Sequence, residues 1–125
     1  MRRPKLPPKP KGSVNRLLPA RQPMLPSALN DIFAERKRQI DVEGWTPEHD
    51  DAHSDGEMAI AAACYATAPS MTRIEREWVP PDTPKNWPWH FSWWNPGVRR
   101  RNLVKAGALI VAEIERLDRA HDHNI

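Results

Sequence analysis

The sequence predicts a small all-α domain of three principal helices, because three segments carry helical patterns. They cover residues 27–43, a stretch that starts at Ser54 or Asp55 and continues to 66, and residues 99–120. The last is the clearest, since its apolar side chains recur at spacings of three and four and share one helix face: Leu103, Ala106, Ile110, Ile114 and Leu117. With one or two further turns expected at 72–78, we predict a three- to four-helix domain over 27–120 and a frayed tail at 121–125.

The first helix has a start signal and a stop signal. Ser27 follows Pro26 and is expected to cap the N-terminus, while Gly44 is suited to the residue that ends a helix. Arg36 and Gln39 border its apolar stripe, so either side chain could reach inward to an anion.

Charged residues break the usual pattern at two places on the last helix. Glu113 falls within the apolar face, where a carboxylate is costly unless it has a partner. Arg99, Arg100 and Arg101 begin the helix, although acids are preferred in a first turn. Together with free backbone N–H groups they could hold a phosphate. The alternative is a solvated triplet that follows a loop.

The N-terminal segment differs in composition from the rest of the chain. Residues 1–26 hold seven of the 14 prolines and seven Lys or Arg, with no acid. Their charge is therefore +7, and because the whole chain has a net charge of +3, residues 27–125 carry −4. Such a segment cannot bury enough apolar surface to offset its ordering entropy, and we expect a disordered basic arm. The arm could bind nucleic acid electrostatically.

Residues 68–97 form an irregular, proline-rich segment that is dense in aromatic rings. The rings fall within eight positions: Trp87, Trp89, Phe91, Trp93 and Trp94. We expect most of them to pack over the helices and complete the core. The alternative is a platform on which Trp89, Trp93 or Trp94 stacks against a base or a peptide.

The densest group of reactive side chains lies between the first two helices, in residues 45–57, which we call the elbow. It contains two imidazoles and four carboxylates: His49, Asp50, Asp51, His53, Asp55 and Glu57. Thr46 is expected to cap a short turn with Pro47 at its first position. The i,i+4 spacing of His49 and His53 echoes the zincin pattern H-E-x-x-H, but no third zinc ligand is evident.

Two interpretations of the elbow remain open. In the first, it holds a divalent metal ion. The expected metal ligands are carboxylates: Asp51, Asp55, Glu57 and Glu113. The residues expected to handle a proton are His49, His53 and Asp50. Oxygen ligands favour Mg²⁺ or Mn²⁺ over Zn²⁺. In the second interpretation, the acids cap turns while the histidines pack and hydrogen-bond.

Three blocks of the sequence resemble a family of small, mostly uncharacterised phage and prophage proteins. They are E-R-K-R-Q-I-D-V-E-G-W-T-P-E-H-D-D-A-H-S-D-G-E-M-A-I-A-A-A-C-Y-A, W-P-W with W-W-N-P, and R-R-N-L-V-K-A-G-A-L-I-V-A-E-I-E-R-L-D-R. The resemblance covers roughly residues 34–119 and implies a phage or prophage origin. It implies no settled activity.

A more distant likeness is to the MazG-like all-α nucleotide pyrophosphohydrolases, in which short helices present carboxylates to Mg²⁺ around a nucleoside triphosphate. This likeness implies roles for Gln39, Glu57, Glu113 and Asp118. The paired E-x-x-E and E-x-x-D motifs of that group are absent. Where each motif would have its second acid, three residues after Glu57 and after Glu113, the chain has Ile60 and Arg116. The likeness therefore bears on the fold more than on catalysis.

The resemblance implies a phage accessory protein, and the elbow and the last helix lead us to expect that it binds a phosphorylated ligand, with a nucleotide favoured. If it is an enzyme, we expect metal-assisted phosphoanhydride hydrolysis. The alternative is a non-catalytic interaction protein, such as an inhibitor of a host factor or a nucleic-acid binder, acting through the tryptophans and the basic arm. Alanine-rich helices in so small a body favour a homodimer.

The expected location is the cytoplasm of a bacterial host cell. Cys64 is the single cysteine, which excludes an internal disulfide and fits a reducing compartment. No apolar run matches a secretory signal or a membrane-spanning helix.

Overall fold

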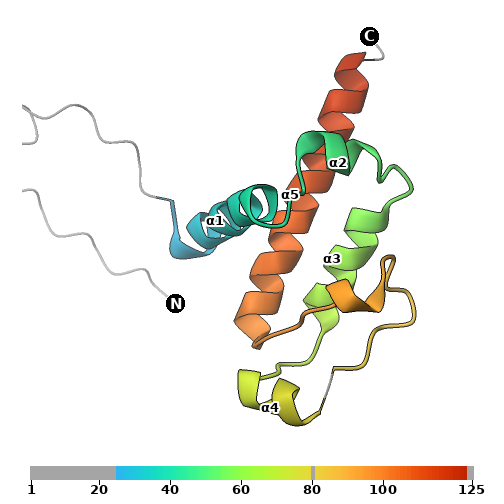
Figure 1. Cartoon of the computed structure of the whole chain (residues 1–125). Coiled ribbons are helices and arrows are strands. Elements are labelled where there is room, and N and C mark those ends of the chain that lie inside the picture. Colours follow the sequence, from blue (N-terminus) through green and yellow to red (C-terminus); the bar gives the residue numbers. More distant parts are fainter. Residues whose placement is uncertain (1–24, 80, 124–125) are drawn as a thin grey trace, which may run out of the picture.

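The computed structural model describes residues 25–79 and 81–123, and its helices confirm the all-α prediction (Figure 1). No strand occurs among these residues. The helices are α1 (Ser27–Asp41), α2 (Pro47–Asp51), α3 (Glu57–Thr67), α4 (Arg73–Trp78) and α5 (Arg99–His123), with a 3₁₀ turn η2 at Phe91–Trp93. The basic arm predicted at 1–26 lies almost entirely outside the described residues. None of the described helices is long and apolar enough to cross a bilayer.

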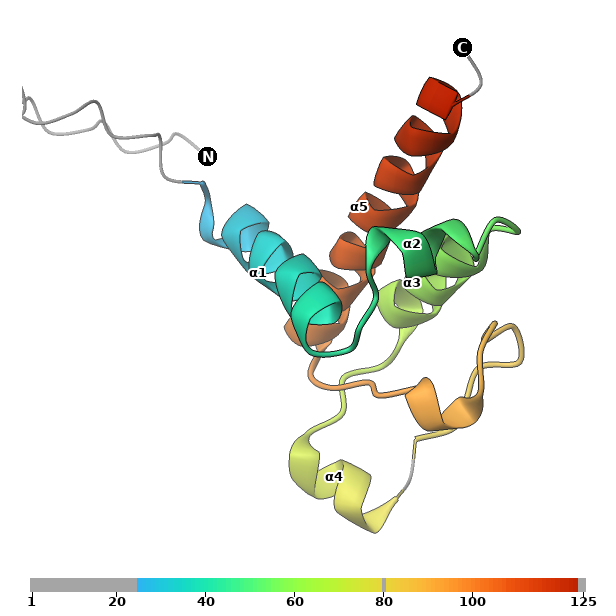
Figure 2. The same ribbon diagram turned by 45° about the horizontal axis from the view of Figure 1, so that its top comes forward.

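Helix α5 is the axis of the domain, and α1, α2 and α3 all pack against it (Figure 2). Helix α1 comes especially close at Gly107. A Cβ atom at this position would lie only 2.8 Å from Ile32 Cδ1 and 3.0 Å from Ile32 Cγ1. Glycine at this point in α5 therefore allows the close contact between the two helices, because any larger side chain would force Ile32 to move.

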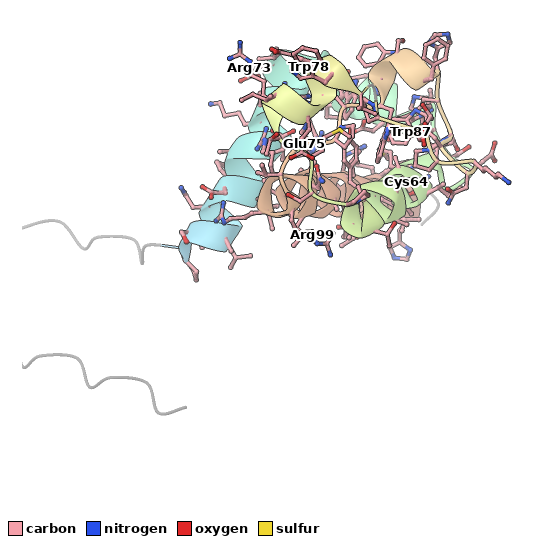
Figure 3. The ribbon with its side chains drawn as sticks, turned by 90° about the horizontal axis from the view of Figure 1, so that it is seen from below. Cys64, Arg73, Glu75, Trp78, Trp87 and Arg99 are labelled. Carbon is pink, nitrogen blue, oxygen red and sulfur yellow. The ribbon has the colours of Figure 1, made fainter. Side chains whose placement is uncertain are left out.

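The core lies between α3, α5 and the irregular segment that joins α4 to α5, which we call the tryptophan-rich loop. Its buried members are Met58, Ala61, Ala62, Cys64, Tyr65, Ala68, Trp87, Trp94, Ala106, Leu109 and Ala112. Trp87 lies beside α3, close to Cys64 (Figure 3). The prediction that tryptophans complete the core is confirmed for Trp87 and Trp94. Burial raises the pKa of the Cys64 thiol, in keeping with a small packing residue.

The apolar face expected on α5 is not the one that α5 buries. Leu103, Ile110, Ile114 and Leu117 are each about half exposed, and of the predicted stripe only Ala106 is buried. The buried residues of α5 are three alanines and four larger residues: Ala106, Ala108, Ala112, Asn102, Val104, Lys105 and Leu109. The alanines allow close approach of the neighbouring helices, so the fit between helices, and not the spacing of the large apolar residues, selects the buried face.

Helix boundaries follow the local signals at most ends. The Thr46 side chain accepts a hydrogen bond from His49 N at 3.3 Å with Pro47 as the first residue of α2, as predicted. Ser27 does not cap α1, because the helix already begins there and Pro26 takes the N-cap position. The tail predicted to fray at 121–125 is helical as far as His123, since no glycine or proline follows Ala120 to end α5.

Candidate functional site

The elbow and the tryptophan-rich loop meet at an open cleft of about 380 Å³, which we call the tryptophan cleft. Its lining consists of Glu43, Trp45, His49, His53, Trp89, His90 and Trp93. Two segments more than thirty residues apart in the chain therefore form one concave surface. Pockets of this kind, apolar with a few convergent polar groups, are where small molecules bind.

Trp45 is the centre of the aromatic wall. Its ring centroid lies 5.7 Å from that of Trp89 and 6.2 Å from that of Trp93, with the planes tilted by 53° and 51°. The His49 ring stacks on Trp45 at 6.2 Å with an angle of 6° between the planes. Trp89 Nε1 is buried and has no hydrogen-bond partner among the described residues. Of the predicted stacking residues, Trp89 and Trp93 line this cleft.

Trp94, the third predicted stacking residue, belongs to the core instead. It is buried, and its Nε1 donates to the Asp82 carbonyl oxygen at 3.0 Å. Its ring contacts Tyr65, with centroids 4.8 Å apart. A ring held on both sides in this way supports the loop and does not face the tryptophan cleft.

The two elbow histidines come together on one side of α2. Their Nε2 atoms are 3.3 Å apart. Each Nδ1 atom contacts a carboxylate: His49 Nδ1 lies 3.2 Å from Asp50 Oδ1, and His53 Nδ1 lies 2.8 Å from Glu57 Oε2. Burial works to raise the pKa of Glu57, but its hydrogen bonds with His53 and backbone N–H groups outweigh burial, and the pKa lies below its ordinary value.

Arg36 is committed to Asp50. Its Nη2 donates to Asp50 Oδ2 at 2.8 Å, and both side chains are buried. Its Nη1 donates to the Trp45 carbonyl oxygen and its Nε to Glu115 Oε1, each at 3.2 Å. Arg36 was predicted to bind a ligand, whereas these contacts use its guanidinium to fix the elbow against α1. The charge of Asp50 is likewise engaged from within the protein.

The four carboxylates predicted to bind metal do not form one cluster. Asp51 Oδ1 accepts from Arg119 Nη2 at 2.8 Å, and Glu113 accepts from Arg116 Nε at 2.5 Å. The prediction that Glu113 needs a partner is confirmed, with Arg116 one turn away supplying it. Glu57 contacts His53 and the backbone N–H of Asp55, whose side chain is exposed. Across the described ranges, no group of three or more His, Cys, Asp and Glu is arranged to hold a metal ion.

The arginine triplet ties α5 to its neighbours. Arg99 Nη1 donates to the Ala66 carbonyl oxygen, Arg100 Nη1 lies 2.7 Å from Asp31 Oδ2, and Arg101 Nη2 pairs with Glu35. Figure 3 shows Arg99 at the start of α5. Arg100 and Arg101 line a second open cleft with Asp31, Glu35 and Arg38, which shares no lining residue with the tryptophan cleft. The structure thus separates the predicted phosphate-binding arginines from the predicted stacking residues.

A buried polar group lies beneath the tryptophan cleft. Gln39 is buried, with its Nε2 donating to Glu35 Oε2 at 3.3 Å and its Oε1 lacking a partner in the part of the chain described. It lines a cavity of about 40 Å³ together with Lys105, Trp45 and Trp93. Such a volume suits one water molecule, so Gln39 lies too deep to touch a ligand of nucleotide size.

Among the charged residues that line this cavity, Lys105 and Glu35 have lowered pKa values, and hydrogen bonds to Glu35 and Glu43 raise the pKa of Arg38. Burial lowers the pKa of Lys105 to about 8, and its Nζ donates to the Asn95 carbonyl oxygen at 2.7 Å. Burial works to raise the pKa of Glu35, but hydrogen bonds and charges from Arg38 and Arg101 hold it below its ordinary value. Neither residue stood out in the sequence, because a lone Lys or Glu on a helix is most often exposed.

Three residues that line the cleft were not predicted from the sequence to be site residues: Glu43, Trp45 and His90. Trp45 gave a usable signal, since a large ring stands directly before a polar elbow and after a helix-ending glycine. Comparison of the chain with protein-family models, with curated proteins and with solved structures found no match. The resemblance to phage proteins therefore stays a prediction, and the geometry of the tryptophan cleft alone carries the functional argument.

Proposed function

We propose that this protein is a phage or prophage accessory protein that binds a nucleotide, with the base held in the tryptophan cleft. The observation that carries the proposal is the meeting of Trp45, Trp89 and Trp93 around one open concave surface. Every nucleobase has a π face, and stacking of a base on an aromatic side chain contributes about 1–3 kcal/mol. The exposed face of Trp93 gives a base direct access to this wall.

Polar groups at the rim suit the edges of a base. Glu43 lines the cleft and already accepts from Arg38 Nη1 at 2.8 Å, so a second carboxylate lone pair remains to accept from an exocyclic amino group. The imidazoles of His49 and His53 are further polar groups in the lining. Binding is the proposed function, and phosphoanhydride hydrolysis is a further readout of its test.

The test is to titrate nucleoside triphosphates, nucleoside monophosphates and nucleosides into the protein in the presence of EDTA and to measure binding by calorimetry. Trp93→Ala should weaken binding about 5- to 150-fold, the equivalent of one lost stack. Trp78→Ala is the matched control, since Trp78 is 82% exposed on α4 and does not line the cleft. Equal affinities for both variants, or no binding across the whole panel, would remove the nucleotide proposal. Release of phosphate or pyrophosphate after addition of Mg²⁺ or Mn²⁺ would extend it to hydrolysis.

A second candidate function, self-association, is favoured by a different surface. Leu103, Ile110 and Leu117 lie seven residues apart on α5, with Ile114 beside them, and all four are about half exposed. Heptad spacing of apolar residues is the pattern of a helix that packs against another helix. The C-terminal half of α5 extends beyond α1 and α3 (Figure 2). We therefore propose that this face packs against α5 of a second copy of the chain.

Light scattering coupled to size-exclusion chromatography tests this second candidate. The wild type should elute as a dimer and the Ile110→Lys/Leu117→Lys variant as a monomer, because two buried lysines would face each other across the interface. Ile74→Lys is the control, as Ile74 is an exposed apolar residue on α4. A monomeric wild type at every concentration tested would refute it.

A further inference from the structure

The contact between the two elbow histidines raises a question of proton positions. His49 Nε2 and His53 Nε2 face each other at 3.3 Å, while each Nδ1 is directed at a carboxylate. An ionised carboxylate can only accept a hydrogen bond. Asp50 is ion-paired with Arg36 at 2.8 Å, and Glu57 Oε1 accepts from the backbone N–H of Asp55 at 2.6 Å. Both carboxylates are therefore acceptors, and both Nδ1 atoms carry the proton.

A neutral imidazole with its proton on Nδ1 has a lone pair on Nε2. If both imidazoles are neutral, two Nε2 lone pairs lie 3.3 Å apart, and they repel unless a proton or a metal ion is shared between them. Zinc lies about 2.0–2.1 Å from each histidine nitrogen in a tetrahedral site, which places two such nitrogens about 3.3–3.4 Å apart. The observed separation of 3.3 Å matches this value.

We propose that His49 and His53 bind a divalent transition-metal ion of the Zn²⁺ class through their Nε2 atoms. Asp50 and Glu57 then act as positioning residues, because a carboxylate on Nδ1 fixes the tautomer and orientation of a metal-binding imidazole. Imidazole ligands favour Zn²⁺, Cu²⁺ and Ni²⁺, whereas Mg²⁺ and Mn²⁺ favour oxygen ligands. The metal and its ligands thus differ from those expected of the carboxylates in the sequence.

The protein supplies two ligands, since among the described residues no third His, Cys, Asp or Glu joins them. Water, or an oxygen of a molecule in the tryptophan cleft, completes the coordination, as both histidines line that cleft. Ring contacts hold the pair from two sides: Trp45 stacks on His49, and Trp89 meets the edge of His53 at 5.5 Å. The inferred metal site needs only His49, His53, Asp50 and Glu57, so it does not depend on nucleotide binding.

The test is calorimetric titration of the full chain, purified without a histidine tag, with Zn²⁺, Ni²⁺ and Mg²⁺ salts. We expect one Zn²⁺ or Ni²⁺ ion per chain and no binding of Mg²⁺ at the same concentrations. His49→Gln and His53→Gln should each weaken Zn²⁺ binding by more than tenfold, and Glu57→Ala by about 10- to 100-fold. His90→Gln is the control, since His90 lines the same cleft but its Nδ1 contacts Ser92 Oγ at 2.8 Å. The variant His121→Gln/His123→Gln should also retain binding, which excludes the C-terminal histidines.

A second measurement keeps the inference testable if a variant unfolds. Nitrogen-15 NMR of the wild-type imidazoles should show both Nδ1 atoms protonated and both Nε2 resonances shifted on addition of Zn²⁺. The inference is overturned if Zn²⁺ does not bind, if it binds equally well to the folded His49→Gln and His53→Gln variants, or if either Nε2 keeps a proton in the presence of Zn²⁺. Because EDTA removes free Zn²⁺ from the nucleotide titration, that titration measures nucleotide binding without metal. A negative result in either titration therefore does not contradict the other proposal.

Discussion

Replacing Asp50 by Asn tests the ion pair that joins the elbow to α1. The side chains of Arg36 and Asp50 are only 8% and 2% exposed, and their Nη2–Oδ2 distance is 2.8 Å. The substitution keeps the volume of the side chain and removes its charge. Removing one partner of a buried pair costs about 3–5 kcal/mol, because the other charge remains buried. Glu115 still contacts Arg36 Nε at 3.2 Å, so we expect the lower end of this range.

The predicted loss is large enough to measure by thermal unfolding. In a domain of this size each kcal/mol shifts Tm by about 4–8 °C, so a loss of about 3 kcal/mol lowers Tm by about 12–24 °C. Unfolding is followed by far-ultraviolet circular dichroism in EDTA, so that no bound metal contributes to stability.

The neighbouring acid provides a matched control. Asp51 also pairs with an arginine, Arg119, but these side chains are 48% and 29% exposed. Solvent-exposed pairs contribute about 0–1 kcal/mol, so Asp51→Asn should lower Tm by at most a few degrees. Equal losses for Asp50→Asn and Asp51→Asn would refute the reasoning, because burial of the pair would then contribute nothing. An Arg36→Met/Asp50→Asn double variant more stable than Asp50→Asn alone would show that the unpaired guanidinium causes the loss.

Three further predictions concern positions where α1 and α5 pack together or bury a charge. The pKa of Lys105 is about 8 when folded and 10.5 when exposed, so stability rises with pH between these values, by about 3 kcal/mol. In urea unfolding, Lys105→Met should lack this rise, and a rise equal to that of the wild type would contradict the assignment. The lowered pKa of Glu35 stabilises the fold above about pH 4.5 and loses this effect as pH falls through the folded pKa. Glu35→Gln should therefore be less stable at neutral pH yet decline less in acid, whereas parallel acid limbs would exclude Glu35 as the cause. Gly107→Leu should destabilise the fold by about 1–3 kcal/mol in thermal unfolding, since its Cβ would meet Ile32 at 2.8 Å. An unchanged Tm would show that α1 moves freely away from α5.

The elements of the elbow show how far local signals reach. The Thr46-Pro47 signal fixed the start of α2, because an N-cap side chain and a proline act within one helical turn. The i,i+4 spacing of His49 and His53 does not by itself explain their contact, because α2 ends at Asp51 and the turn after it brings the two Nε2 atoms to 3.3 Å. The roles of these histidines and of the neighbouring carboxylates stay predictions.

The partners of the predicted site residues depended on chain segments far apart in the sequence. Arg36 contacts Asp50 and Glu115, and Arg101 contacts Glu35, in each case across helices. A charged residue that borders an apolar stripe can face solvent, a ligand or another charge, and only the neighbouring helix selects among these. The sequence indicated that Arg36 lies at the edge of the face but not what it meets there.

The sequence by itself determined the helices and the density of reactive groups in the elbow, since helix signals and composition are local. Only the tertiary structure decided which face of α5 is buried. Both faces carry apolar residues: Ile110 and Ile114 are exposed, while Ala108, Leu109 and Ala112 are buried. The reason is steric: the alanines let the neighbouring helices approach α5 closely, and this contact also covers Leu109, which is 1% exposed. The same packing brings Trp45 of the elbow to Trp89 and Trp93 of the loop, and so creates the tryptophan cleft.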